Sequence, residues 1–227
     1  LCNKFFIGLL AVLLFYAGQV FYAVALPGVA HTAPFSPWSF GAYLGRLLPL
    51  VWVGALFFLT FFTSARERRA AVLTAATPAD PRRYALVRCA AALVGVALLC
   101  LEALALAALL YARLFGWTDW GSLALPALVI LAPPLVFALG SGWLLGRLRP
   151  WLLYVWMLLP FALAALPLPE ALGLWNGGLC TSYPLTLGML DPAFSLPAAA
   201  WAVQGLLLAA GVLLLLVAGK GKKVYNQ

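Results

Sequence analysis

The sequence predicts an all-α membrane protein with six transmembrane helices, in a single transmembrane domain covering residues 1–227. The first observation is composition: 66% of the 227 residues are hydrophobic and 9% are charged, whereas soluble domains are about 45–50% apolar and about 25% charged. The second is that apolar residues form long uncharged runs, close to the length of about 20 residues that a spanning helix needs. The third is that positive charges gather between alternate runs. Together these observations exclude an ordinary water-soluble globule.

Turn-forming residues divide the apolar runs. Pro27–Gly28 follows the first run, and Arg147–Pro150 separates the fourth run from the fifth. The first run is too long for a removable signal peptide, and further spans follow it. The six expected spans are residues 5–26, 44–63, 87–112, 123–145, 151–166 and 197–218.

The net charge of +8 is explained by topology. Most of the 14 basic residues lie at the termini or in the second and fourth connections, so the positive-inside rule predicts cytoplasmic termini and a multi-pass protein of the cytoplasmic membrane. Their place in short segments beside the membrane makes lipids the expected partner and argues against nucleic acid. These residues are Lys4, Arg66, Arg68, Arg69, Arg82, Arg83, Arg88, Arg147, Arg149, Lys220, Lys222 and Lys223.

Motifs for catalysis and metal binding are missing from the sequence. The single histidine, His31, has no Asp, Glu or Cys near it in the chain, and the four cysteines form no CxxC pair. HExxH, GxSxG and the phosphate-binding GxxxxGK[ST] loop do not occur. We therefore expect no catalytic residue, no cofactor and no metal in this chain, and any ATP-driven activity requires a separate ATP-hydrolysing partner.

The connection between the second and third spans has well-defined local signals. Ser64 and Glu67 have the spacing of a capping box, which predicts a short cytoplasmic helix over residues 65–76. The helix must end before Pro78, because the residue preceding a proline leaves the helical region. Asp80 is then expected as the N-cap of the next helix, with Pro81 at its first position, leading into the third span. One interpretation is an amphipathic helix whose arginines bind anionic lipid headgroups.

The order of parts in this connection resembles the first intracellular loop of ABC-2 type transporter permeases. The shared features are a charged beginning at Arg66–Arg69 (Arg-Glu-Arg-Arg), a turn at the end of Leu73–Pro78, and the basic residues Arg82 and Arg83 before the chain re-enters the membrane. A second match is Tyr183–Thr186 (Tyr-Pro-Leu-Thr), which is similar to the Asn-Pro-Leu-Thr stretch of that family. The family usually has an amphipathic helix before its first span, and here only residues 1–4 precede it. We expect that helix to be trimmed or the chain to be a shortened variant.

The resemblance implies a membrane subunit of an ABC exporter. In such a transporter residues 65–76 form a coupling helix that docks on separate ATP-binding cassette subunits, which hold the ATP and Mg. Two permeases, identical or homologous, pair in one transporter. The residues expected to couple to the ATPase are Ser64, Arg66, Glu67, Arg68, Arg69, Leu73, Pro78, Arg82 and Arg83.

Residues 167–197 are largely uncharged but repeatedly interrupted by Pro and Gly, for example at Gly177–Gly178 and Pro184. Irregular backbone of this kind is tolerated in a membrane only where protein or water lines it. The resemblance to ABC-2 permeases implies a re-entrant helical segment between spans five and six that caps the outer end of the pathway. A plain extracellular loop is the alternative.

Polar side chains within the spans are few. Glu102 lies in the outer part of the third span, where an unpaired carboxylate is costly. We expect it to pair with Arg46 near the outer end of the second span, or else to contact a cationic or polar substrate. Gln19 and Gln204 are expected to form interhelical hydrogen bonds.

Six tryptophans lie near expected span ends, where an indole anchors a helix at the lipid headgroups. Stacking on a substrate is the alternative role for any of them. They are Trp38, Trp117, Trp120, Trp151, Trp175 and Trp201.

The expected function is export of an unidentified amphipathic substrate, which could be lipid-, peptide- or drug-like. One rival is a six-span carrier or uptake component with its own energy source, which would need intramembrane ion-coupling residues that are scarce here. The other is a non-transporting membrane anchor or assembly protein, in which the loop helix binds lipid.

Overall fold

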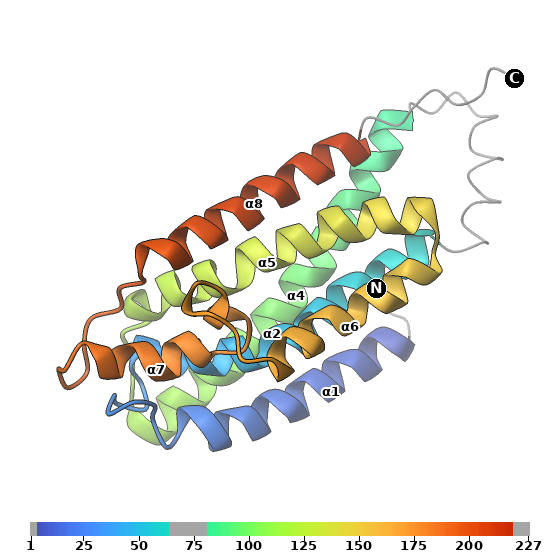
Figure 1. Ribbon diagram of the computed structural model, residues 1–227. Helices are drawn as coiled ribbons and strands as arrows, with labels where there is room; N and C mark the ends of the chain where they lie inside the picture. Colours follow the sequence, from blue (N-terminus) through green and yellow to red (C-terminus); the bar gives the residue numbers. More distant parts are fainter. Residues whose placement is uncertain (1–3, 64–80, 220–227) are drawn as a thin grey trace, which may run out of the picture.

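The computed structural model describes residues 4–63 and 81–219, and within these ranges it contains helices and loops but no β-strand (Figure 1). The all-α class is confirmed for this part of the chain. In chain order the elements are α1 (Lys4–Val20), the π-helical turn η1 (Phe21–Ala25), α2 (Pro37–Thr63), α4 (Pro81–Phe115), α5 (Gly121–Leu148), α6 (Trp151–Ala165), the 3-10 helix η2 (Glu170–Trp175), α7 (Gly178–Thr186) and α8 (Ala198–Gly219).

Five helices in the described ranges are long and apolar enough to cross a membrane. They are Lys4–Ala25, Pro37–Phe62, Val87–Phe115, Gly121–Leu148 and Ala198–Val217, and they coincide with five of the expected spans. The sixth expected span, 151–166, corresponds to α6. This helix has 15 residues and is therefore about 22 Å long, against a hydrocarbon core of about 30 Å. The structure thus defines a multi-pass membrane protein with five candidate spans and a shorter apolar helix.

Two helices start more than a full turn before the apolar runs from which the spans were predicted. α2 begins at Pro37 instead of residue 44, because the Ser36 hydroxyl accepts a hydrogen bond of 3.1 Å from the backbone N–H of Ser39 and so caps the first turn. α4 begins at Pro81, the position that the proline predicts. Its 35 residues make it about 52 Å long, so it extends beyond the hydrocarbon core.

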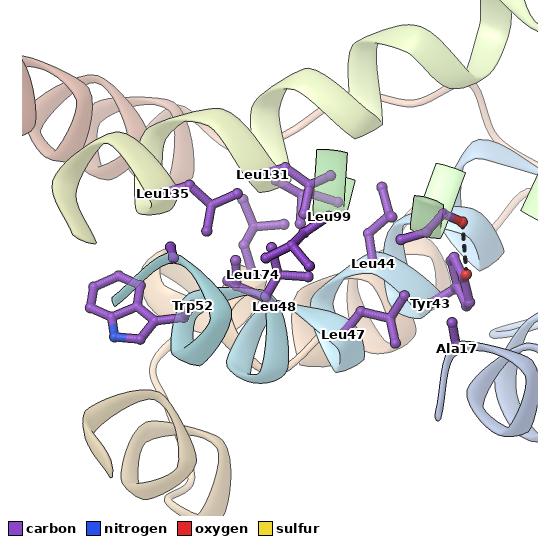
Figure 2. Close-up of a cluster of buried hydrophobic side chains, with 14 of the residues drawn as sticks. Ala17, Tyr43, Leu44, Leu47, Leu48, Trp52, Leu99, Leu131, Leu135 and Leu174 are labelled. Carbon is purple, nitrogen blue, oxygen red and sulfur yellow. Dashed lines mark hydrogen bonds between the residues drawn. The ribbon is translucent and has the colours of Figure 1, made fainter. Parts of the chain in front are cut away.

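Helix α2 is the core of the bundle. It packs against α1, α4, α5, α6 and α7. In its most apolar stretch of 18 residues, 67% is buried, compared with 22% for the corresponding stretch of α1 and 28% for that of α4. Figure 2 shows its side chains between those of the surrounding helices. We infer that α2 holds the other helices in place, while α1, α4 and α8 present broad apolar faces outward. The labelled core residues are Ala17, Tyr43, Leu44, Leu47, Leu48, Trp52, Leu99, Leu131, Leu135 and Leu174.

Helices α5 and α8 lie side by side and run in the same direction (Figure 1). Their backbones approach closely at two glycines: a Cβ on Gly140 would lie 2.5 Å from the carbonyl oxygen of Gly211. A Cβ on Gly211 would in turn lie 2.6 Å from the backbone nitrogen of Phe137. Such contacts between small residues are how helices gain van der Waals packing in a membrane, where no hydrophobic force drives association.

The segment 167–197 folds into η2 and α7, both of which pack against α2. Gly177 links the two helices with a positive φ of 74°, and a Cβ there would lie 2.9 Å from the carbonyl oxygen of Ala42 in α2. Leu174 and Cys180 are fully buried on either side of this link. The same end of the bundle carries the connections 26–36 and 116–120 (Figure 1), and we call it the η2–α7 end.

Two of the tryptophans expected at the membrane interface are core residues instead. Trp38 is fully buried, and its indole N–H donates a hydrogen bond of 2.8 Å to the carbonyl oxygen of Pro192. Trp175 is 3% exposed and lies against Trp52, with a ring-centroid distance of 5.3 Å. They are buried because η2 and the 187–197 loop fold back over α2, which proximity to a span end could not indicate.

The other four tryptophans remain compatible with an interfacial role. Trp120, Trp151 and Trp201 are exposed near the starts of α5, α6 and α8. Trp117 is half-buried and stacks on Phe35 at 4.5 Å.

Candidate functional site

Most of the expected ATPase-coupling residues lie outside the part of the chain that the structure describes. This applies to the helix expected over 65–76 and to Ser64, Arg66, Glu67, Arg68, Arg69, Leu73 and Pro78. Arg82 and Arg83 fall in the first turn of α4. What the structure does show is how the two ends of this connection are held.

Arg88 joins the end of α2 to the start of α4. Its guanidinium donates a hydrogen bond of 2.8 Å to the carbonyl oxygen of Phe62 and lies 5.5 Å from the centre of the Phe62 ring. A cation is favourable at this position because the last carbonyls of a helix carry a partial negative charge. One turn deeper, Gly95 allows the ring of Phe58 to pack directly on α4, where a Cβ would meet that ring at 2.8 Å. The end of α2 is therefore joined to α4 about two turns inside α4, and we call this contact the Arg88 junction.

The structure does not bring Glu102 and Arg46 together. Glu102 is partly buried in α4, and its Oε2 is buried without a hydrogen-bond partner. Arg46 is exposed on a different face of α2, beside Tyr16 of α1. The contact between α2 and α4 near Glu102 is made instead by Tyr43, whose hydroxyl donates a hydrogen bond of 3.0 Å to the carbonyl oxygen of Ala103 (Figure 2). The expected ion pair is therefore not formed, because the two helices turn these side chains in different directions.

Arg46 lines a cavity of about 410 Å³ between α1, α2, α6 and the link from η2 to α7. Tyr16, Arg46 and Asn176 supply its side-chain polar groups. Only Arg46 was identified from the sequence. Tyr16 and Asn176 carry no local signal, since they come from segments far apart in the chain and converge only in the folded bundle.

A second cavity, of about 480 Å³, lies between the C-terminal half of α4 and the N-terminal part of α5. Its lining is apolar, with Leu101, Leu123 and Trp120 among its walls. Trp120, whose indole N–H is a donor, is the only residue with a polar side-chain group among those that line it.

The two glutamines occupy different environments. Gln19 is exposed on α1. Gln204 of α8 is 2% exposed, and neither its amide nitrogen nor its amide oxygen has a hydrogen-bond partner. The expected interhelical hydrogen bonds of Gln204 are therefore not formed.

The interhelical hydrogen bonds near the middle of the bundle involve residues that the sequence did not single out. The indole N–H of Trp52 donates to the carbonyl oxygen of Trp156 at 3.2 Å, and the indole N–H of Trp156 donates to the Ser141 hydroxyl at 2.9 Å. These two hydrogen bonds link α2, α6 and α5. The Gly140–Gly142 triplet around Ser141 was the available signal, because small residues mark close helix contacts in membranes.

Within the described ranges no three His, Cys, Asp or Glu side chains come together as metal ligands would. Cys180 of α7 is fully buried, and burial raises the pKa of its thiol to about 12. Since the thiolate is the nucleophile, burial disfavours the reactive form of this cysteine.

Comparison with known proteins finds no match to this chain among protein-family models, curated proteins or solved structures.

Proposed function

We propose that this protein is the permease subunit of an ATP-driven ABC exporter, with residues 65–76 as its coupling helix. The proposal rests on the resemblance of residues 64–83 to the first intracellular loop of ABC-2 permeases. The observation in the structure that supports it best is the Arg88 junction. A coupling helix whose two flanking helices are held together can pass on a push from a partner, whereas one between loosely packed helices would absorb it.

The proposed mechanism uses the position of α2. Closure of the ATP-binding subunits on nucleotide displaces the coupling helix, and the Arg88 junction passes this displacement to α2 and α4 as a unit. Because α2 packs against α1, α4, α5, α6 and α7, its tilt changes the whole bundle. ATP binding shifts this equilibrium only if the docked helix has different contacts with the two ATPase states.

The finer topology belongs to the same proposal. We infer six crossings, with α6 as the fifth, and both termini on the cytoplasmic side. The segment made of η2 and α7 is the re-entrant cap at the outer end, supported by the burial of Leu174, Trp175 and Cys180 against the bundle. A second permease, identical or homologous, packs on the exposed apolar faces. The cargo is an amphipathic molecule.

Two rival functions make different demands. A carrier with its own energy source transports its substrate in liposomes on an ion gradient without ATP. A membrane anchor transports nothing in either condition. Within the candidate spans of the described ranges Glu102 is the only acidic residue, so it is the one carboxylate that an ion-coupled carrier could use there.

The first test is co-purification in a mild detergent from the native membrane. We expect an ATP-binding subunit to be retained with the chain and its ATPase activity to be stimulated by transported substrate. In the double variant Glu67→Ala/Arg69→Ala we expect that stimulation to be lost while the chain is still inserted and folded. Arg147→Ala/Arg149→Ala is the matched control, because it removes two cations from the other short cytoplasmic connection.

A chain that purifies without any ATP-binding protein would count against the exporter. So would a Glu67→Ala/Arg69→Ala variant whose stimulated ATPase equals that of the unaltered protein.

A further inference from the structure

The cavity that Arg46 lines has one polar wall and one apolar wall. The polar wall contains Arg46 and Asn176, and the apolar wall contains Val12 and Phe161. Val12 is 56% exposed and Phe161 is 48% exposed. Because α1 and α6 carry these exposed apolar side chains, the cavity opens sideways toward lipid.

Arg46 lies within the candidate span Pro37–Phe62, and a charge inside a span is unfavourable. It is the tenth residue of α2, which begins at Pro37, so it lies about 14 Å along the helix from the η2–α7 end. Charged residues at such depths pair with an opposite charge or reach a wet cavity. No Asp or Glu is among the residues that line this cavity, so the protein itself supplies no counter-charge there.

The groups around Arg46 are suited to a polar headgroup. The planar guanidinium can donate two parallel hydrogen bonds to a phosphate or carboxylate. The Asn176 side-chain oxygen accepts a 2.8 Å hydrogen bond from the backbone N–H of Gly178, which leaves its NH₂ group available as a donor. Pro49 has no N–H, so the carbonyl of Gly45 lacks its usual helical partner and can accept from a ligand hydroxyl. The polar wall therefore offers donors for an anion beside an acceptor for a hydroxyl.

The size of the cavity indicates more than a free ion. A volume of about 410 Å³ falls in the range of small-molecule sites and is many times the roughly 30 Å³ that one water occupies in the liquid. An ion such as phosphate would leave most of the apolar wall exposed. A headgroup joined to an acyl chain would fill both walls.

We propose that this cavity binds one anionic membrane lipid, with its acidic phosphate on Arg46 and the start of its acyl chains between α1 and α6. The site requires only that the helices lie in a membrane, and it is independent of whether the protein is an exporter. The bound lipid supplies the counter-charge that Glu102 does not provide.

The test is native mass spectrometry of the full chain in an uncharged detergent, with equal amounts of phosphatidylglycerol and phosphatidylcholine. We expect one phosphatidylglycerol to be retained in preference to phosphatidylcholine. Arg46→Gln should weaken its binding at least tenfold. The control is Arg113→Gln, because Arg113 is an exposed cation near the same end of the bundle that does not line the cavity.

A second variant tests the apolar wall without touching the charge. Ala164 is an exposed residue of α6 on the cavity wall, and Ala164→Trp fills the space intended for the acyl chain. We expect it to weaken phosphatidylglycerol binding with Arg46 intact. Size-exclusion elution and thermal unfolding of each variant show that the fold is retained.

Several results would overturn the proposal. If Arg46→Gln and Arg113→Gln weakened phosphatidylglycerol binding equally, the effect would be one of overall charge. If the protein retained phosphatidylglycerol and phosphatidylcholine equally, the charge of the lipid would have no role. Displacement of phosphatidylglycerol by millimolar inorganic phosphate would define a simple anion site. Unchanged binding in Ala164→Trp would place the lipid elsewhere.

Discussion

At the residue scale, close backbone contacts at glycines hold the segment 167–197 on the bundle. Gly45 of α2 lies against the link between η2 and α7, where a Cβ would be 2.7 Å from both the Cα and the nitrogen of Gly177. A backbone atom cannot move aside as a flexible side chain can. Gly45 also lines the Arg46 cavity, so the same residue that admits η2 and α7 helps to form the polar wall.

Gly45→Ala is therefore expected to destabilise the protein, by about 1–3 kcal/mol, as overpacking of a tight contact usually does. The measurement is the apparent melting temperature in detergent. Gly205→Ala is the control, since a Cβ at Gly205 in α8 meets nothing within 4 Å. That variant should be neutral or slightly more stable, because glycine weakens a helix by about 0.5–1 kcal/mol relative to alanine. If the two variants melted at the same temperature, the close contact would have no energetic weight.

At the scale of elements, the Arg88 junction is where α2 and α4 act together. Arg88 is half-buried and binds a carbonyl and a ring of the same residue, Phe62. Phe6 of α1 also reaches this end of α2, with its ring centre 5.3 Å from that of Phe58. α1, α2 and α4 are thus packed together near the end of α2 that leads into the proposed coupling helix.

Arg88→Gln is expected to lower the free energy of unfolding by about 1–2 kcal/mol, because a hydrogen bond from a charged group contributes about 1.5–3 kcal/mol and this one is partly screened by solvent. Thermal unfolding in detergent measures the loss. Lys4→Gln removes an exposed cation from the neighbouring end of α1 and should have little effect. Equal melting temperatures for the two variants would show that removing charge, and not the junction, governs the result.

At the scale of the whole molecule, α6 decides the topology. If α6 crosses the membrane, the segment 167–197 lies on the same side as the 116–120 connection. If it does not cross, that segment lies on the opposite side, and it could not then share the η2–α7 end of the bundle with the 116–120 connection as it does in Figure 1. Its hydrogen bonds to α2 and α5 through Trp52, Trp156 and Ser141 place it within the bundle, which favours a crossing where the bilayer is locally thinned.

Single cysteines report this topology directly. In a variant without Cys2, Cys89 and Cys100, we introduce Met189→Cys or Thr118→Cys and treat intact cells with a membrane-impermeant maleimide. Both positions are exposed, and both are expected to be labelled from outside. The buried Cys180 gives no background. Labelling of Thr118→Cys in intact cells, but of Met189→Cys only after lysis, would rule out a crossing by α6.

Across these scales, the local features of the sequence predicted the elements well. A run of about 20 apolar residues is a local quantity, so five expected spans appear as helices, and Pro81 marked the start of α4. Ser36 also carries a local signal, since serine is a preferred helix cap, but Pro37 and Ser39 interrupt the apolar pattern in the first turn of α2.

The sequence by itself determined that the chain is helical and belongs in a membrane, because helix length and hydropathy are set by neighbouring residues. Only the tertiary structure decided which face of each helix points inward. Lipid is as apolar as the protein interior, so helices that are apolar all round carry little pattern to show their rotation. For this reason the sequence did not show that Trp38 and Trp175 are buried, that Glu102 and Arg46 are apart, or that Arg46 faces a cavity.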